Sequence, residues 1–142
     1  MKLITKFIFN PGAYPNNVNI ALLILRIVIG IFMLTHGIGK FQTLFGSEPI
    51  QFSDPIGLGA TASLALVVFS EVFCSILLII GLGTRFAAIP LFTTMMVAAF
   101  IVQINNGFGK QELALLYALI YTTIAITGAG KYSVDYLIYG ER

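Results

Sequence analysis

The sequence contains very few of the residues that hold metals or form disulfides, with one cysteine, Cys74, and one histidine, His36, in 142 residues. A single cysteine excludes a disulfide within the chain. One histidine beside one cysteine excludes zinc sites built from several such ligands, and it excludes a haem held by two histidines. We therefore expect no metal site and no covalently bound cofactor.

Charged residues are also scarce, at 10% of the chain, whereas 58% of the residues are hydrophobic. The 8 Lys and Arg against 6 Asp and Glu give a formal net charge of +2, which favours neither nucleic acid nor an acidic partner. A single water-soluble domain of this length has no need of so apolar a composition. The lipid bilayer is therefore the expected surrounding of the chain.

The sequence contains four long apolar runs. A helix needs about 20 mostly apolar residues to cross about 30 Å of hydrocarbon, and such runs occupy residues 20–39, 60–82, 86–104 and 113–129. We predict an all-α, integral membrane four-helix bundle formed by a single domain over residues 1–142. An even number of spans puts both termini on one side, where cations are more numerous, which favours cytoplasmic termini in an inner (plasma) membrane.

Each apolar run is followed by Gly-x-Gly and then by a lysine or an arginine. These four segments begin at Gly37, Gly81, Gly107 and Gly128. Glycine accepts the left-handed conformation that closes a helix, and a cation is favourable near the last carbonyl groups. The pattern predicts four helix ends at these positions.

Two ionisable residues lie deep within the apolar runs, Arg26 in the first and Glu71 in the second. Each costs at least about 2.5–3.5 kcal/mol at a helix centre unless it is paired or hydrated. Because their depths within the two spans nearly match, we predict an Arg26–Glu71 ion pair. Such a pair is either a clamp that fixes helix packing or part of a functional site, and the sequence leaves both interpretations open.

Further polar residues are expected to extend this pair into a pocket near the outer surface. Its members are Arg26, His36, Lys40, Glu71, Glu112 and Tyr117. Taken singly, His36 is equally a donor to a carbonyl group, Lys40 a cation that reaches the interface, and Glu112 a partner for the N-terminus of the fourth helix. The longest connection, residues 41–59, is the best candidate for a lid.

Several short motifs resemble, in their order and spacing, the DoxX family of small four-span membrane proteins. Between about Ile20 and Asp135 they are Arg26-x3-Gly30, His36-Gly37-x2-Lys40, Glu71, Gly81-Leu82-x-Thr84-Arg85 and Gly128-x-Gly130-x2-Ser133-x-Asp135. The resemblance implies relatives among subunits associated with quinol oxidase and thiosulfate:quinone oxidoreductase complexes and a membrane partner of redox-defence enzymes. It implies that the family's polar positions are Arg26, His36, Lys40, Glu71, Arg85 and Glu112. Structural or interface roles are expected for Arg85 and Asp135.

The polar pocket and the resemblance together favour a membrane subunit of, or anchor for, a quinone-linked oxidoreductase system. In this hypothesis a quinone-like headgroup binds among His36, Lys40, Glu112 and Tyr117, because quinone carbonyls accept hydrogen bonds and their reduction consumes protons. The sequence has no flavin motif and no cluster of cysteines. A soluble or membrane redox enzyme would therefore supply the electrons, and this chain would be a non-catalytic or quinone-binding subunit.

Two other functions remain open. One is a carrier or binding protein for a small solute or lipid, working as a homodimer, with Arg26–Glu71 as an inner gate and residues 41–59 as an outer flap. The other is a non-catalytic scaffold that anchors a soluble enzyme through its cytoplasmic faces near Arg85 and residues 131–142.

Overall fold

The computed structural model describes residues 2–140, and every regular element in this range is helical. In chain order the elements are α1 (Lys2–Ile8), α2 (Asn16–Phe45), α3 (Ala60–Val68), η1 (Phe69–Cys74), α4 (Ser75–Ile80), α5 (Thr84–Val97), η2 (Ala98–Val102), η3 (Ile104–Asn106), α6 (Phe108–Thr127) and α7 (Val134–Tyr139). The first two η elements are π-helical turns continuous with the neighbouring α-helices, and η3 is a 3-10 turn. The all-α class is confirmed for the described residues.

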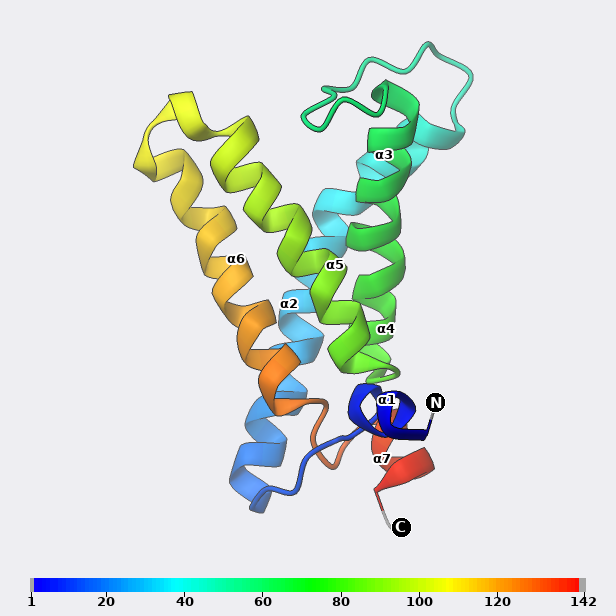
Figure 1. Cartoon of the computed structure of the whole chain (residues 1–142), viewed down its shortest axis with the longest axis vertical. Helices are drawn as coiled ribbons and strands as arrows, with labels where there is room; N and C mark the ends of the chain where they lie inside the picture. Colours follow the sequence, from blue (N-terminus) through cyan, green and yellow to red (C-terminus); the bar gives the residue numbers. More distant parts are fainter. Residues whose placement is uncertain (1, 141–142) are drawn as a thin grey trace.

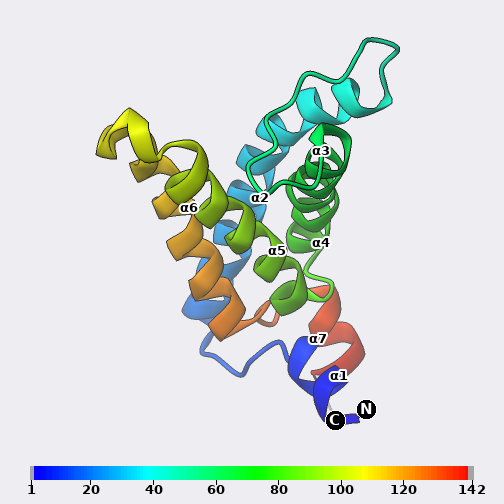
Figure 2. The same ribbon diagram turned by 45° about the horizontal axis from the view of Figure 1, so that its top comes forward.

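The long helices form two hairpins that meet at one end and separate at the other. The first hairpin pairs α2 with the rod made of α3, η1 and α4, and the second pairs α5 and η2 with α6 (Figure 1). Figure 2 shows the two hairpins diverging toward the end that carries the loop of residues 46–59. The short helices α1 and α7 lie at the closed end, where the ring of Tyr139 in α7 stacks on that of Phe9, the residue after α1.

The outer surface of the helices is apolar. Large side chains such as Ile24, Leu66 and Ile126 are exposed on it, which is the arrangement expected where lipid replaces water. Three helical rods are long and apolar enough to cross a membrane, namely Asn16–Phe45, Ala60–Ile80 and Thr84–Val102. The 20-residue α6 covers most of the fourth predicted span but is not one of these three, and its first turns contain three consecutive polar residues, Lys110, Gln111 and Glu112.

The predicted helix ends are confirmed at Gly81 and Gly128, where α4 and α6 end with φ of 74° and 85°. The prediction is wrong at Gly37, because α2 continues through it to Phe45. A Cβ atom on Gly37 would lie 3.0 Å from the Cβ of Glu71, so this glycine permits close helix packing. Gly107 lies in the turn between η3 and α6, immediately before α6 begins.

The loop of residues 46–59 is held to α3 by one carboxylate, Asp54. It accepts hydrogen bonds from the hydroxyl of Ser63 (2.7 Å) and from the backbone N–H groups of Leu58 (2.9 Å) and Gly59 (2.8 Å). The Ser63 hydroxyl, followed by the Gly59 N–H, lowers the pKa of Asp54 from its ordinary value because these donors favour the charged form. The charged carboxylate is therefore the form that fixes the loop.

Replacing Asp54 by alanine is expected to raise amide hydrogen exchange at residues 58–63 at neutral pH, because three donors lose their acceptor. Since the folded pKa is lowered, the stabilisation is complete above the ordinary aspartate pKa of about 3.9 and is lost as the pH falls through the lower, folded value. At fixed pH below that value, wild type and variant should exchange alike. Glu48→Ala in the same loop is the control, and equal protection in both variants at neutral pH contradicts the clamp.

Candidate functional site

A partly buried ion pair joins the first two long helical rods. The Lys40 ammonium donates to both carboxylate oxygens of Glu71, at 2.7 Å to Oε1 and 2.6 Å to Oε2. The Glu71 side chain is 3% exposed, whereas that of Lys40 is 33% exposed. The carboxylate is therefore the member that depends on its partner for compensation of its charge.

Local helix geometry contributes to the placement of Glu71. The residue lies in η1, a π-helical turn that holds one more residue per hydrogen-bonded ring than an α-helix does. Its neighbour Ser70 accepts a hydrogen bond of 2.9 Å from the hydroxyl of Thr94 on α5. The second π-helical turn, η2, faces the same region from the end of α5. Such turns are frequent at functional sites.

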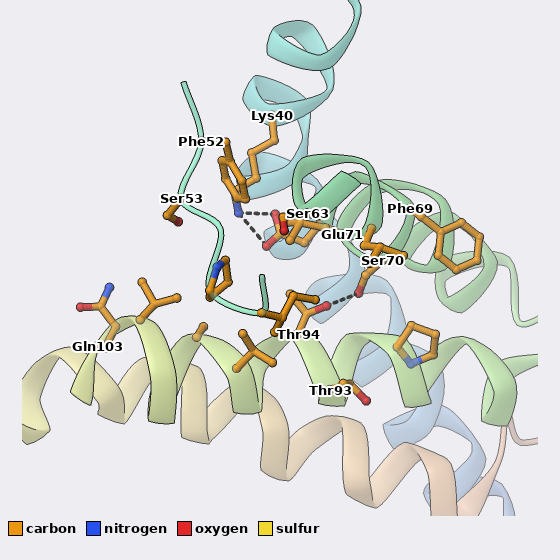
Figure 3. Close-up of a pocket in the computed structure, with 18 of the residues that line it drawn as sticks. Lys40, Phe52, Ser53, Ser63, Phe69, Ser70, Glu71, Thr93, Thr94 and Gln103 are labelled. Atoms are coloured by element: carbon orange, nitrogen blue, oxygen red, sulfur yellow. Dashed lines mark hydrogen bonds and ion pairs between the residues drawn. The ribbon is translucent and has the colours of Figure 1, made fainter. Parts of the chain in front are cut away.

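A cavity of about 610 Å³ lies between the two hairpins, in the space where they diverge (Figure 3). Figure 3 shows Lys40, Glu71, Ser70 and Thr94 directed toward one another along one side of it. The remaining lining is mainly apolar and comes from α3, α5, η2 and the loop: Phe52, Pro55, Ile56, Leu66, Val67, Phe69, Ile89, Pro90, Val97, Ala98 and Val102, with the polar residues Ser53, Ser63, Thr93 and Gln103. This cavity, here called the large cavity, combines an apolar wall with one charged pair.

A second cavity, of about 240 Å³, lies on the other side of the ion pair, between α2 and α6. The residues that line it are Met33, His36, Lys40, Glu71, Met95, Ala98, Gln103, Lys110, Leu113, Ala114 and Tyr117. His36 packs edge-on against the ring of Tyr117, with 6.1 Å between ring centroids. Lys40, Glu71, Ala98 and Gln103 line both cavities, so the ion pair lies where the large cavity and this small cavity adjoin.

The predicted Arg26–Glu71 pair is wrong, and the packing register explains why. Gly30 lies against Ser75, whereas Gly37 lies against Glu71. Arg26 is 11 residues before Gly37 in one helix, which at about 1.5 Å per residue separates it from the level of Glu71 by roughly 16 Å. The inner gate of the carrier hypothesis is therefore not formed by these two residues.

Arg26 instead binds backbone at the closed end of the molecule. Its guanidinium is fully buried and donates to the carbonyl oxygens of Leu78 (3.2 Å) and Tyr132 (2.6 Å). The carboxylate of Asp135 interacts electrostatically with the guanidinium. Position 81 requires glycine, because a Cβ atom there would overlap the guanidinium. Arg26 thus ties α2 to α4 and to the segment that precedes α7.

Asp135 and Arg85 tie further segments together at this end. The two Asp135 oxygens accept hydrogen bonds from the backbone N–H groups of Gly83 (2.8 Å) and Thr84 (3.0 Å), where α5 begins. Arg85 donates to the carbonyl oxygens of Asn10 (3.3 Å) and Thr127 (3.4 Å). Both residues connect chain segments far apart in sequence.

The structure brings together Lys40, Glu71, His36 and Tyr117, but it does not bring Glu112 to them. The Glu112 side chain is exposed, and it lines neither cavity. Lys110, two residues earlier, lines the small cavity in its place, together with Gln103. Helical spacing on α6 would have predicted Lys110 in this position, because Lys110, Ala114 and Tyr117 recur at intervals of four and three and share one helix face.

Comparison with known proteins finds relatives along most of the chain. The family model described as DoxX matches residues 21–104. The Bacillus subtilis protein named "Putative oxidoreductase CatD" is 30% identical over 121 residues, which cover 84% of this chain and 88% of the relative. An uncharacterized Haemophilus influenzae protein is 35% identical over 118 residues (78% and 85%). The inner membrane protein YqjF of Escherichia coli is 27% identical over 124 residues (84% and 93%). No solved structure matches the chain significantly.

Proposed function

The chain belongs to the DoxX family, and from this membership we propose that it is a multi-pass membrane subunit of, or anchor for, a quinone-linked redox system. Its long apolar helices and its relatives named as membrane proteins make it a membrane protein. The proposal further assigns the large cavity as the place where a quinone-like ring binds. The observation that carries this assignment is an apolar cavity of about 610 Å³ with one partly buried ion pair on its wall.

The proposed topology has four spans, with α6 as the fourth. The exposed side chains Leu116, Leu119 and Ile126 give α6 an apolar outer face, and Lys110 to Glu112 would then lie at headgroup level. Four spans return the chain to its starting side, in keeping with the position of α1 and α7 at one end of the molecule in Figure 1. Arg85 and Lys131 lie at that end, which favours a cytoplasmic location for it in the inner (plasma) membrane.

The size and polarity of the large cavity support a ring with hydrogen-bond acceptors. Binding pockets for small organic molecules measure about 300–1,000 Å³, are mostly apolar and have few polar groups that fix orientation. An ammonium has three protons, and two of those on Lys40 engage the Glu71 oxygens. The third is available to a quinone carbonyl, so Lys40 would orient the ring.

Reduction of a quinone to a quinol takes up two electrons and two protons. In the proposal Glu71 relays protons to the bound ring, because a carboxylate next to the reacting oxygen is positioned for general acid–base work. The electrons come from a soluble or membrane redox enzyme that associates with this subunit. The chain therefore contributes binding, orientation and proton transfer, and its partner contributes the oxidation of a donor.

Purified protein in a mild detergent is expected to contain extractable quinone, and added ubiquinone-1 should raise its melting temperature saturably. Lys40→Met should weaken ubiquinone-1 binding about tenfold or more, because a hydrogen bond from a charged donor contributes about 1.5–3 kcal/mol. Lys131→Met is the matched control, since this exposed lysine lines neither cavity. The absence of quinone from the extract, together with no saturable shift in the wild type, would contradict the proposal.

A further inference from the structure

The small cavity gathers cationic and hydrogen-bond-donating side chains with little negative charge to balance them. Lys40, Lys110, His36, Gln103 and Tyr117 all contribute to its lining. The one carboxylate there, Glu71, is already neutralised by Lys40. Lys110 and His36 are exposed residues. Lys110 is thus a positive charge without an acidic partner in the lining of the cavity, at the first turn of the 20-residue α6, where the N-terminal end of a helix adds partial positive charge.

Three of these donors have no partner within residues 2–140. The Lys110 ammonium, the His36 ring nitrogens and the Tyr117 hydroxyl make no hydrogen bond or ion pair there, although the His36 and Tyr117 rings touch. Tyr117 is largely buried, whereas its hydroxyl remains accessible and can donate to an acceptor in the cavity that it lines. An acceptor with several oxygen atoms and negative charge would satisfy all three.

We propose that the small cavity binds a phosphate group, held by Lys110, His36 and Tyr117. Its volume of about 240 Å³ equals that of about eight water molecules at about 30 Å³ each, which is enough for a tetrahedral oxyanion and a few waters. Phosphate pairs well with ammonium groups and ring N–H donors. This site stands on its own contacts and does not require that the large cavity bind a quinone.

The phosphate has two possible sources, a phospholipid headgroup and free inorganic phosphate. Leu113 on α6 lines the cavity and is an exposed apolar residue, and Phe32, next to the lining residue Met33 on α2, is exposed as well. The acyl chains of a phospholipid would lie along these side chains. Basic pockets between membrane helices recognise anionic headgroups in this manner. Free phosphate satisfies the same donors without these apolar contacts.

The test measures the melting temperature of purified protein in a neutral detergent during titration with phosphatidylglycerol, or with inorganic phosphate at constant ionic strength. A saturable rise is expected in the wild type and in Lys131→Met. In Lys110→Met and His36→Gln the midpoint should move to at least about tenfold higher concentration, and Lys110→Arg should restore it. Saturation by phosphatidylglycerol alone assigns the lipid as the source, and saturation by inorganic phosphate assigns the free ion.

The same titrations contain the result that overturns the phosphate site. If neither probe gives a saturable shift in the wild type, then the cavity does not recognise phosphate. The same conclusion follows if the midpoint of Lys110→Met equals that of the wild type and of the control Lys131→Met. Because Lys110 and His36 do not line the large cavity, ubiquinone-1 binding is measured in the same variants and should be unchanged. The two proposals therefore fail independently.

Discussion

Replacement of Lys40 by methionine is expected to lower the free energy of unfolding by about 3–5 kcal/mol, the usual cost of leaving a buried charge without its partner. Glu71, at 3% exposure, then loses the cation that contacts both of its carboxylate oxygens. Replacement of Glu71 by glutamine should cost less, because Lys40 is one third exposed and its ammonium can turn toward water or headgroups. Loss of Lys40 is thus expected to lower the free energy of unfolding more than loss of Glu71.

Reversible unfolding with dodecyl sulfate in dodecyl maltoside micelles measures both changes. The double variant Lys40→Met, Glu71→Gln should recover most of the loss, since an apolar replacement of a complete buried pair is often neutral. If Lys40→Met proves no less stable than Glu71→Gln, then Glu71 obtains compensation from another group and the ion pair is not what stabilises it.

Replacement of Arg26 by methionine should also cost about 3–5 kcal/mol. It leaves the carbonyl oxygens of Leu78 and Tyr132 without a donor inside the protein, at about 1–3 kcal/mol each. It also removes the positive charge beside Asp135. Arg26→Lys should recover only part of this stability, because a single ammonium cannot reproduce the planar fork that reaches two separate chain segments.

The same unfolding assay tests Arg26, with proteolysis of the 128–140 segment as a second readout. Arg26→Met should become more sensitive to protease there, because the Tyr132 carbonyl loses its hydrogen bond from α2 and Asp135 loses the positive charge beside it. Lys131→Met keeps all backbone contacts of this segment and is the control. An Arg26→Lys variant as stable as the wild type would contradict the requirement for the two-pronged donor.

Composition and the length of the apolar runs were sufficient to predict the all-helical class, because a run of about 20 apolar residues matches a helix that crosses the bilayer and satisfies its own backbone hydrogen bonds. The helix ends at Gly81 and Gly128 were predictable for a local reason, since their positive φ is a conformation that glycine adopts without cost. Gly37 has the same sequence context but lies within a helix, where it is needed for a close contact with Glu71. Local patterns do not distinguish these two uses of glycine.

The register between helices could not be read from the sequence. The prediction aligned the centres of the apolar runs, whereas α2 extends six residues beyond Gly39, the predicted end of its span, to Phe45. In the observed register Lys40 lies beside Glu71, and Arg26 lies at the level of Leu78. The π-helical turns at Phe69–Cys74 and Ala98–Val102 further change which residues of these helices face the neighbouring helices, and no residue pattern in the sequence indicates such turns.

The residues that form the candidate site were therefore easier to predict than the ion pair that they make. Lys40, Glu71, His36 and Tyr117 were expected to converge, and all four line the small cavity. Glu112 was chosen for its charge, although it is two residues before Ala114 and hence about 200° around the helix from the inward face. Helical spacing alone would have selected Lys110.

The π-helical turns also determine how this architecture responds to changes in chain length. Deleting one residue from Ala98–Val102 would let the turn relax to an ordinary α-helical one, and because the π-helical turn holds one residue more than an α-helical turn, the residues that follow would keep nearly the same direction. Gln103 would still line both cavities, whereas a deletion from a regular α-helical turn would rotate the residues that follow by about 100°. Loss of a single codon at a π-helical turn is thus a change in length that homologous chains could accept while keeping the compartment between the two hairpins.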